Sequence, residues 1–234
     1  MAQARVNLLR AVIWDLDGVL LDSYEAHYRT WQKVLVERGI PAARDVFERS
    51  FGMNNHATTK LWLRDLWTPA LAEEIAERKE ALFREEMRTQ ARAHPGAVDW
   101  LARLRRAGWR QALGSSAPQA NIDVALDALD IRRYLDAVCS GEGLPSKPDP
   151  TLFLNAARAL GVEPARCVVV EDAPAGVAAA KAAGMRCMAL TTTHGADAFG
   201  AADVIAPGLN ALPADVFDRL VPNPVEQTHT SPHR

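Results

Sequence analysis

The sequence predicts an α/β protein: a doubly wound (Rossmann-like) parallel sheet core with an inserted all-α helical cap domain. Two observations lead to this prediction. From about residue 96 onward, short apolar runs alternate with helical patterns, which is typical of a parallel sheet covered by helices on both faces. Between about residues 23 and 92 the alternation stops, and apolar residues recur only at helical spacing.

Six short apolar runs are the predicted strands. Polar or glycine-containing turns flank them and several are rich in β-branched residues, which favours strands over buried helices. The runs cover residues 8–14, 110–113, 137–139, 167–170, 186–190 and 203–205, of which the last is the weakest.

Helical patterns fill the gaps between these strands, over residues 97–107, 118–129, 150–160 and 174–183. Pro150 and Pro174 are expected at the first helical position, where a missing N–H costs nothing. Asp149 is expected to cap the helix that begins at Pro150. Gly161 and Gly184 are expected to end the last two helices.

The helical segment inserted after the first strand is predicted to be a cap. Tyr24, Tyr28 and Trp31 recur at helical spacing near its start. An insert at the carboxyl end of the first strand would lie over the ligand crevice of the sheet. The expected domains are a discontinuous catalytic core of residues 1–22 and 93–221, a cap of residues 23–92 and a flexible tail of residues 222–234.

Composition and charge narrow the class of protein. The 234 residues are 48% hydrophobic and 24% charged, which is ordinary for a soluble globular enzyme. A net charge of −2 gives no reason to expect nucleic acid or an anionic membrane as partner. Three cysteines without zinc-site spacing favour a reducing compartment. Without a signal peptide or a bilayer-length apolar run, a cytoplasmic location is expected.

The strongest chemical signal is the pair Asp15 and Asp17, directly after the first predicted strand. In a continuing strand both side chains would point to the same face, and Gly18 then allows a sharp turn. Because like charges repel, the pair implies a metal, an acid/base couple, or both. A lone pair of this kind is more often a helix cap or a solvated turn, but its position after a buried strand weighs against that alternative.

A second acidic pair, Glu171 and Asp172, ends the fourth predicted strand. Taken alone, Asp172 is a common type of helix cap. Together with Asp15 and Asp17, however, it would bring four carboxylates to one edge of the sheet. Such a group is costly without a hard cation, and oxygen ligands suit Mg²⁺.

Two further motifs are candidate phosphate-binding elements. Lys147 lies in a loop that Pro148 and Pro150 stiffen, although a solvated loop lysine is the commoner interpretation of such a residue. Ser115 and Ser116 lie between a strand and a helix, where hydroxyl and backbone N–H groups form anion sites. Serine-rich turns are common, so this motif is weak by itself.

The order of these motifs resembles that of the haloacid dehalogenase-like superfamily. Asp15-Leu-Asp-Gly-Val resembles its first motif, Ser115 its second, Lys147 with Pro148 its third, and Glu171-Asp172 its fourth. The resemblance runs from about residue 8 to residue 205. The helical cap, the run 171–177, and the positions of His27 and Trp31 resemble the beta-phosphoglucomutase-like branch.

This resemblance implies a role for each core residue. Asp15 would attack phosphorus and form an aspartyl phosphate, and Asp17 would act as the general acid and base. Mg²⁺ would be held by the carboxylates of Asp15 and Asp172 and the backbone carbonyl of Asp17, with Glu171 as a ligand or beside the ligands. The phosphoryl oxygens would be held by Ser115, Ser116 and Lys147.

The cap is expected to decide between hydrolysis and phosphoryl transfer. Mutases of the resembled branch grip a second phosphate with a cap arginine, and Asn55 occupies that position in loop 51–56. Lys79 or Arg49 could compensate, but the change removes charge and fork geometry. The candidate substrate contacts in the cap are His27, Asn54, Asn55 and Lys79. His27 could instead orient Asp17, or be a satisfied helix histidine.

The expected function is hydrolysis of a small phosphate monoester by an Mg²⁺-dependent phosphatase. The partner is a small-molecule sugar, polyol or glycolate phosphate, and the sequence is compatible with a monomer or a homodimer. The main alternative is a beta-phosphoglucomutase-type phosphotransferase. A non-catalytic protein that binds a phosphorylated ligand and a response-regulator receiver are more remote. The receiver alternative is weakened because its acidic pair precedes its acceptor and it lacks a cap.

Overall fold

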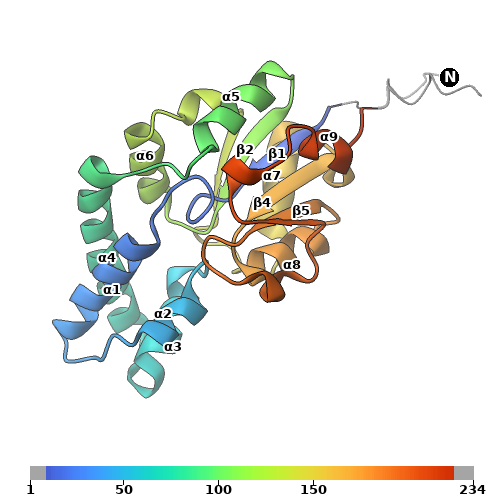
Figure 1. Cartoon of the computed structure of the whole chain (residues 1–234). Coiled ribbons are helices and arrows are strands. Elements are labelled where there is room, and N and C mark those ends of the chain that lie inside the picture. Colours follow the sequence, from blue (N-terminus) through green and yellow to red (C-terminus); the bar gives the residue numbers. More distant parts are fainter. Residues whose placement is uncertain (1–8, 224–234) are drawn as a thin grey trace, which may run out of the picture.

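The computed structural model describes residues 9–223 (Figure 1). Its centre is one sheet of six parallel strands in the order β3-β2-β1-β4-β5-β6. The strands are β1 (Ala11–Trp14), β2 (Arg110–Ser115), β3 (Ala137–Ser140), β4 (Cys167–Glu171), β5 (Arg186–Leu190) and β6 (Val204–Ala206). All six predicted strands are present. The first is shorter than expected, since it begins at Ala11.

Five helices belong to the same part of the chain as strands β2 to β6. They are α5 (Ala97–Arg106), α6 (Gln119–Ala128), α7 (Thr151–Leu160), α8 (Pro174–Ala182) and α9 (Val216–Leu220). Short 3₁₀ turns lie at Arg64–Leu66, Arg132–Tyr134, Pro164–Arg166, Ala196–Phe199 and Leu209–Ala211. The sequence patterns did not predict α9. Pro150, expected at the first helical position, instead precedes the first turn of α7, and Asp149 accepts a hydrogen bond from the Thr151 N–H at 2.9 Å.

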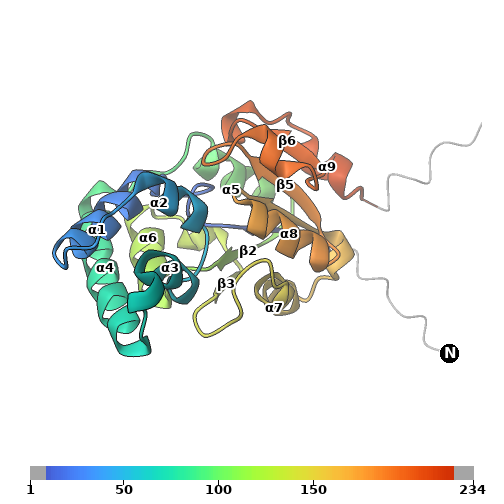
Figure 2. The same ribbon diagram turned by 90° about the horizontal axis from the view of Figure 1, so that it is seen from below.

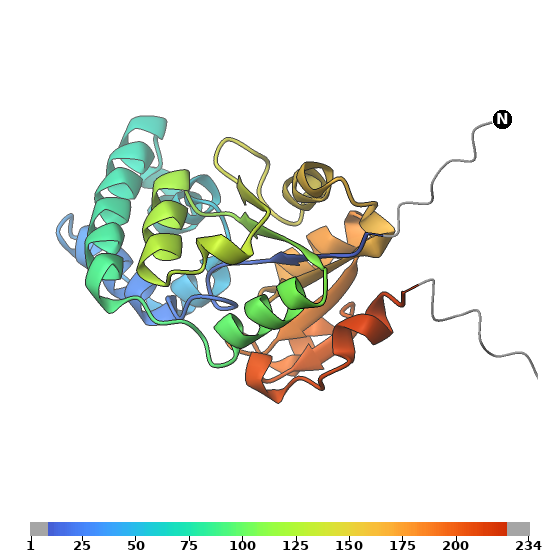
Figure 3. The same cartoon turned by 90° about the horizontal axis from the view of Figure 1, so that it is seen from above.

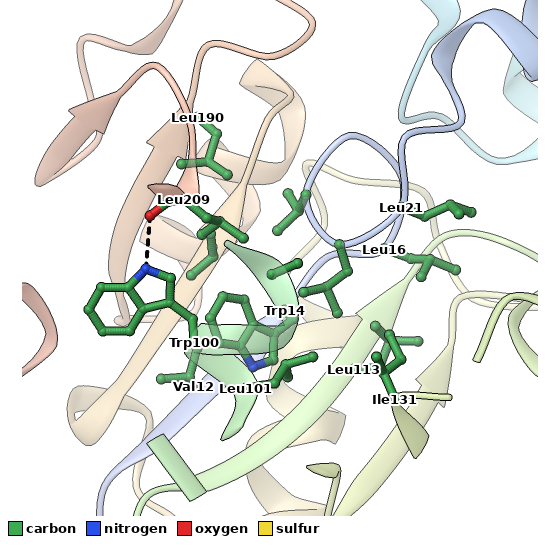
Figure 4. Close-up of a cluster of buried hydrophobic side chains, with 14 of the residues drawn as sticks. Val12, Trp14, Leu16, Leu21, Trp100, Leu101, Leu113, Ile131, Leu190 and Leu209 are labelled. Carbon is green, nitrogen blue, oxygen red and sulfur yellow. Dashed lines mark hydrogen bonds between the residues drawn. The ribbon is translucent and has the colours of Figure 1, made fainter. Parts of the chain in front are cut away.

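Helices cover both faces of the sheet, as Figure 3 shows for α5 and α9 on one side and α7 on the other. β1 alternates between the two resulting cores, and all four of its side chains are fully buried. Val12 and Trp14 belong to one core with residues of α5, α6 and α9. Figure 4 shows them with Trp100 of α5, whose Nε1 donates to the Leu209 carbonyl at 2.8 Å. Ala11 and Ile13 pack with α7 and α8. Burial on both faces explains why β1 is continuously apolar.

Four further helices form the insert between β1 and β2: α1 (Tyr24–Val36), α2 (Arg44–Ser50), α3 (Asn55–Leu63) and α4 (Pro69–Gln90). These cap helices have an apolar core of their own, which includes Trp31, Phe47, Trp62 and Ile75. Figure 2 shows them gathered beside the sheet, with α4 next to α6. The insert contains no strand within the described residues, as the periodicity predicts.

The chain leaves the sheet and returns to it at one point. The Asp22 N–H donates to the Arg92 carbonyl at 2.9 Å, and the His94 N–H donates to the Leu20 carbonyl at 3.0 Å. Leu21 pairs antiparallel with Ala93 between them. We call this short pairing of residues 20–22 with 92–94 the linker ladder.

The strand order places a topological switch point between β1 and β4. From β1 the chain builds β2 and β3 on one side, and from β4 it builds β5 and β6 on the other. Ligands of doubly wound sheets bind at the carboxyl ends of the strands beside such a point. β1 runs toward the cap helices, so they lie at this end of the sheet (Figure 3). In residues 9–223 no helix is both long and apolar enough to span a bilayer.

Candidate active site

Asp15 lies at the carboxyl end of β1, and the turn that follows brings Gly18 near Asp172. The backbone N–H of Asp15 donates to the Val170 carbonyl at 3.0 Å, which continues the pairing of β1 with β4. The chain then turns at Gly18, whose φ is +76°. A Cβ there would lie 2.0 Å from the Asp172 Oδ2 atom. Gly18 is therefore required both by its backbone conformation and by the close carboxylate.

Lys147 lies between two buried carboxylates. Its Nζ donates to Asp15 Oδ1 at 2.8 Å and to Glu171 Oε1 at 2.5 Å, and all three side chains are buried. Burial alone would lower the pKa of the lysine, but the two carboxylates raise it above its ordinary value. Lys147 is therefore a fixed cation inside the site rather than a solvated loop residue.

Glu171 accepts hydrogen bonds from the two backbone N–H groups that precede α8. Its Oε2 accepts the backbone N–H groups of Asp172 at 2.9 Å and Ala173 at 3.0 Å. No side chain of residues 9–223 caps α8, so the capping alternative for Asp172 is wrong, and the Glu171 carboxylate lies beside the first turn of the helix instead. Gly176 makes room for it: a Cβ at Gly176 would lie 1.8 Å from Glu171 Oε1.

This packing gives a testable expectation for Gly176→Ala. Alanine normally favours a helix over glycine by about 1 kcal/mol, but here its methyl group must displace the Glu171 carboxylate. We expect the variant to lose roughly 1–3 kcal/mol of unfolding free energy in urea titrations. Gly200→Ala is the control, because Gly200 has an ordinary φ of −56° and a methyl group there would meet no atom within 4 Å. Equal stability of both variants would contradict the packing argument.

Asp172 completes a group of three carboxylates. Ligand atoms of Asp15, Glu171 and Asp172 lie within 4.8 Å of one another, and Thr193 Oγ1 donates to Asp172 Oδ2 at 2.6 Å. We call these three residues the carboxylate cluster. Burial, opposed by Lys147, raises the pKa of Asp15 to about 7, and burial with the neighbouring carboxylates raises that of Asp172 well above its usual range. A buried, oxygen-only cluster with too little positive charge fits a hard divalent cation.

The carboxylate of Asp17 lies outside this cluster. Its Oδ1 accepts from Ser23 Oγ at 2.6 Å and contacts His27 Nε2 at 3.1 Å. Burial would raise the pKa of Asp17, but His27 and Ser23 bring it below its ordinary value. Asp15 and Asp17 therefore share the site but differ in electrostatic environment: the pKa of Asp15 is raised and that of Asp17 is lowered. Such a difference suits two carboxylates to different chemical roles.

His27 connects Asp17 to the cap lysine. Lys79 Nζ lies 2.8 Å from His27 Nδ1. Because an ammonium only donates, Nδ1 must accept, and the proton of the neutral ring is then on Nε2, facing Asp17. His27 thus bonds to Asp17 as a donor and is held by Lys79 from the other side.

A cavity lies between the sheet edge and the cap helices, and most of the predicted site residues face it. On the core side its walls include Asp15, Asp17, Ser115, Ser116 and Asn121. On the cap side they include His27, Asn55, Thr58, Lys79 and Glu80. The predicted catalytic, serine and cap-lysine positions are therefore brought together at one place.

Two predicted cap positions lie differently from the expectation. Asn54 is not on the wall of this cavity: its Oδ1 accepts the Ala57 N–H at 3.0 Å and caps α3. Asn55 and His56 form the first turn of α3 rather than a loop. Arg49, considered as a substitute cation, is exposed and bonds to Asp45 at 2.9 Å, away from the cavity wall.

Several contributors to the site were not predicted from the sequence. Thr193 follows β5, and the rule that parallel strands end at one edge could have identified it. Ser23 follows the first motif directly. Thr58 lies three residues after Asn55 and therefore on the same helical face. Glu80 gave no signal, because a single acidic residue in a charged amphipathic helix usually faces solvent.

Comparison with known proteins agrees with the site. A family model for haloacid dehalogenase-like hydrolases matches residues 9–184. Validoxylamine A 7'-phosphate phosphatase of Streptomyces hygroscopicus subsp. limoneus is 30% identical over 206 residues, which cover 88% of this chain and 96% of that protein. Beta-phosphoglucomutase of Bacillus subtilis (strain 168) is 33% identical over 186 residues, covering 76% and 81%.

The fold also agrees with that of a solved structure. The crystal structure of beta-phosphoglucomutase from Clostridium difficile superposes with a TM-score of 0.81 at 23% identity, covering 91% of this chain and 96% of that one. At this identity the likeness concerns the fold alone. The matched motifs and the curated relatives establish the rest: this chain is an enzyme that belongs to the haloacid dehalogenase-like hydrolase family, together with phosphatases and phosphomutases.

Proposed function

We propose that this enzyme is an Mg²⁺-dependent phosphatase that hydrolyses a small sugar, polyol or glycolate phosphate through an aspartyl phosphate on Asp15. The observation that carries the proposal is the buried contact of Lys147 with Asp15, which belongs to the carboxylate cluster and lines the cavity. A nucleophilic carboxylate held beside a fixed cation suits attack on an anionic phosphoryl group.

In the first step an Asp15 oxygen forms a bond to phosphorus while the bond from phosphorus to the ester oxygen breaks. The leaving alkoxide takes a proton from Asp17. Because the pKa of Asp17 lies below its ordinary value in the free site, this proton is the one that Asp17 takes from water in the second step. Lys147 and Ser115 hold phosphoryl oxygens, on which negative charge is concentrated. The products are an aspartyl phosphate and the free alcohol.

In the second step water attacks phosphorus, and the bond from phosphorus to Asp15 breaks. Asp17 removes a proton from the water, which returns it to the acid form used in the first step. His27 orients the Asp17 carboxylate through its Nε2 contact. The products are inorganic phosphate and the regenerated Asp15.

The metal would be held by Asp15 and Asp172, with the backbone carbonyl of Asp17 as a further ligand and Glu171 as a ligand or neighbour. The fit rests on the oxygen-only donors and on the raised pKa values of Asp15 and Asp172, which reflect burial first and the neighbouring carboxylates second. When bound, Mg²⁺ would neutralise phosphoryl oxygens and thereby favour attack by Asp15.

Hydrolysis is favoured over phosphoryl transfer between two positions of one sugar. A mutase must retain its bisphosphate intermediate, which requires a strong site for the second phosphate. Asn55 faces the cavity where a guanidinium would be needed, and the exposed Arg49 does not compensate. A neutral amide gives weaker contacts to a dianion than a bidentate arginine does.

The test is incubation of the wild type with beta-glucose 1-phosphate, with and without the 1,6-bisphosphate. We expect release of inorganic phosphate to be faster than formation of glucose 6-phosphate, and to need no bisphosphate. A panel of other sugar, polyol and glycolate phosphates, each with Mg²⁺ or EDTA, identifies the preferred ester. Bisphosphate-dependent isomerisation with little free phosphate would assign the enzyme to the mutases instead.

A further inference from the structure

The cap side of the cavity contains a buried ion pair between adjacent residues of α4. Lys79 Nζ lies 2.9 Å from Glu80 Oε1, and the two residues are 2% and 5% exposed. Burial would raise the pKa of Glu80, but Lys79 brings it below its ordinary value, so the carboxylate is charged. Lys79 also contacts His27, and its ammonium lies 5.3 Å from the Trp31 ring and 5.1 Å from the Phe83 ring. The Lys79 ammonium is thus already surrounded by Glu80, His27 and two aromatic rings.

The second oxygen of Glu80 is held from the catalytic core. Asn121 of α6 donates through Nδ2 to Glu80 Oε2, and the Arg84 guanidinium donates to Asn121 Oδ1 at 2.9 Å. Asn121 is 1% exposed, so this bridge between α4 and α6 is itself buried. Because both carboxylate oxygens are engaged, Glu80 cannot swing away and leave Lys79 free for a ligand.

Because Glu80 balances the charge of Lys79, this pair leaves no net positive charge with which to bind an anionic leaving group. Apart from Lys79, Glu80 and His27, no titratable side chain from the described cap helices lines the cavity. The remaining polar groups there include the Asn55 amide and the Thr58 hydroxyl, and neither has a hydrogen-bond partner among residues 9–223. They lie three residues apart on α3, on one face.

We propose that Glu80 is a specificity-determining residue, which neutralises Lys79 and so makes the cap side of the cavity select phosphate esters whose leaving group is uncharged and hydroxylated. This inference rests on the proposed phosphatase function and narrows its substrate class. Sugar and polyol phosphates satisfy the selection, whereas phosphoglycolate and bisphosphates do not.

The physical reason is the cost of burying an anion without a free counter-ion. A leaving-group carboxylate would approach Lys79 only by competing with Glu80, and it would be repelled by Glu80 at the same time. A hydroxyl group needs only a donor or an acceptor, which Asn55 and Thr58 supply. Rejection by like charge is a common source of specificity.

The experiment compares two pairs of esters that differ only by a carboxylate. One pair is sorbitol 6-phosphate and 6-phosphogluconate, and the other is 2-hydroxyethyl phosphate and phosphoglycolate. For the wild type we expect kcat/KM to be at least about tenfold higher for the neutral member of each pair. In Glu80→Gln the ratio falls at least about tenfold, mainly through a lower KM for the anionic ester, because Lys79 becomes available.

Glu77→Gln is the matched control, since it makes the same change at an exposed position of α4. It should keep the wild-type ratio. In Lys79→Met/Glu80→Gln, which removes both buried charges, the ratio should also stay near the wild-type value, although turnover of both esters falls through loss of the His27 contact. If Glu80→Gln fails to fold, this double variant, which leaves neither charge of the pair buried alone, provides the test instead.

Two outcomes overturn the inference. One is an unchanged ratio in a folded Glu80→Gln. The other is a loss of anionic-ester turnover alone in the double variant, because it means that Lys79 already grips the charged end in the wild type. Absence of phosphate release from all four esters and from the wider panel is different: it contradicts the proposed function itself, and with it the specificity that rests on it.

Discussion

Asp15→Asn is expected to reduce phosphate release from the preferred ester by at least about a thousandfold. Asparagine has nearly the same shape as aspartate, but its amide does not form the aspartyl phosphate. The remaining amide oxygen can still accept from Lys147, which bonds to Asp15 at 2.8 Å in the wild type. The variant should therefore fold. The measurements are single-turnover phosphate release and circular dichroism.

Asp22→Asn is the control for this substitution, because Asp22 is an exposed carboxylate in the same stretch of chain. Its activity should stay close to that of the wild type. Retention of more than a few per cent of activity by Asp15→Asn, in a preparation shown to be free of contaminating phosphatase, would remove Asp15 from the role of nucleophile.

Lys147→Met is expected to have the largest combined effect on stability and activity. It leaves Asp15 and Glu171 buried without the cation that bonds to both, at 2.8 Å and 2.5 Å. Breaking a buried ion pair from one side costs roughly 3–5 kcal/mol. We expect a loss of this size in urea unfolding with EDTA present, and a loss of turnover of at least about a hundredfold because a phosphoryl contact is also removed.

The pH dependence of this loss has a definite sign. An acid whose pKa is raised on folding binds more protons in the native state, so stability falls as pH rises. Burial already raises the pKa of Asp15 to about 7 in the presence of Lys147. Without that cation the destabilisation should be greater at about pH 8 than at about pH 5. Mg²⁺ should restore part of the stability by supplying positive charge.

Lys181→Met is the matched control, since Lys181 is 34% exposed in its side chain and bonds to Asp203 at 2.6 Å. Surface pairs of this kind contribute only about 0–1 kcal/mol. If Lys147→Met were no less stable than this control in EDTA at the higher pH, the carboxylate cluster would not depend on the lysine, and its proposed charge balance would have to be revised.

The position of a residue can be predicted from the sequence where topology alone fixes it. Asp15, Glu171 and Asp172 each follow a buried apolar strand, and parallel strands end at the same edge of a sheet. Lys147 needed the family resemblance as well, because 132 residues separate it from Asp15 and no local pattern links the two. The alternation of strands and helices gave the doubly wound sheet in the same way.

The directions in which side chains point could not be predicted from the sequence. The spacing of Asp15 and Asp17 suggested one shared face, but the chain turns at Gly18 and the Asp17 carboxylate bonds to Ser23 and His27 instead. The direction of the Glu171 carboxylate also depends on packing, here on the space above Gly176. The contact of Asn121 with Glu80 joins two helices that only the tertiary fold brings together.

The linker ladder has a consequence for how such an enzyme diversifies. Paired antiparallel residues hold the two ends of the helical insert about 5 Å apart. The ends are fixed by backbone hydrogen bonds of residues 20–22 and 92–94, not by the side chains of the insert. An insert of another length or sequence would therefore leave the register of β1 with β2 and β4 unchanged. Changes in the cap can then alter its wall of the cavity without moving Asp15, which follows β1 of the sheet.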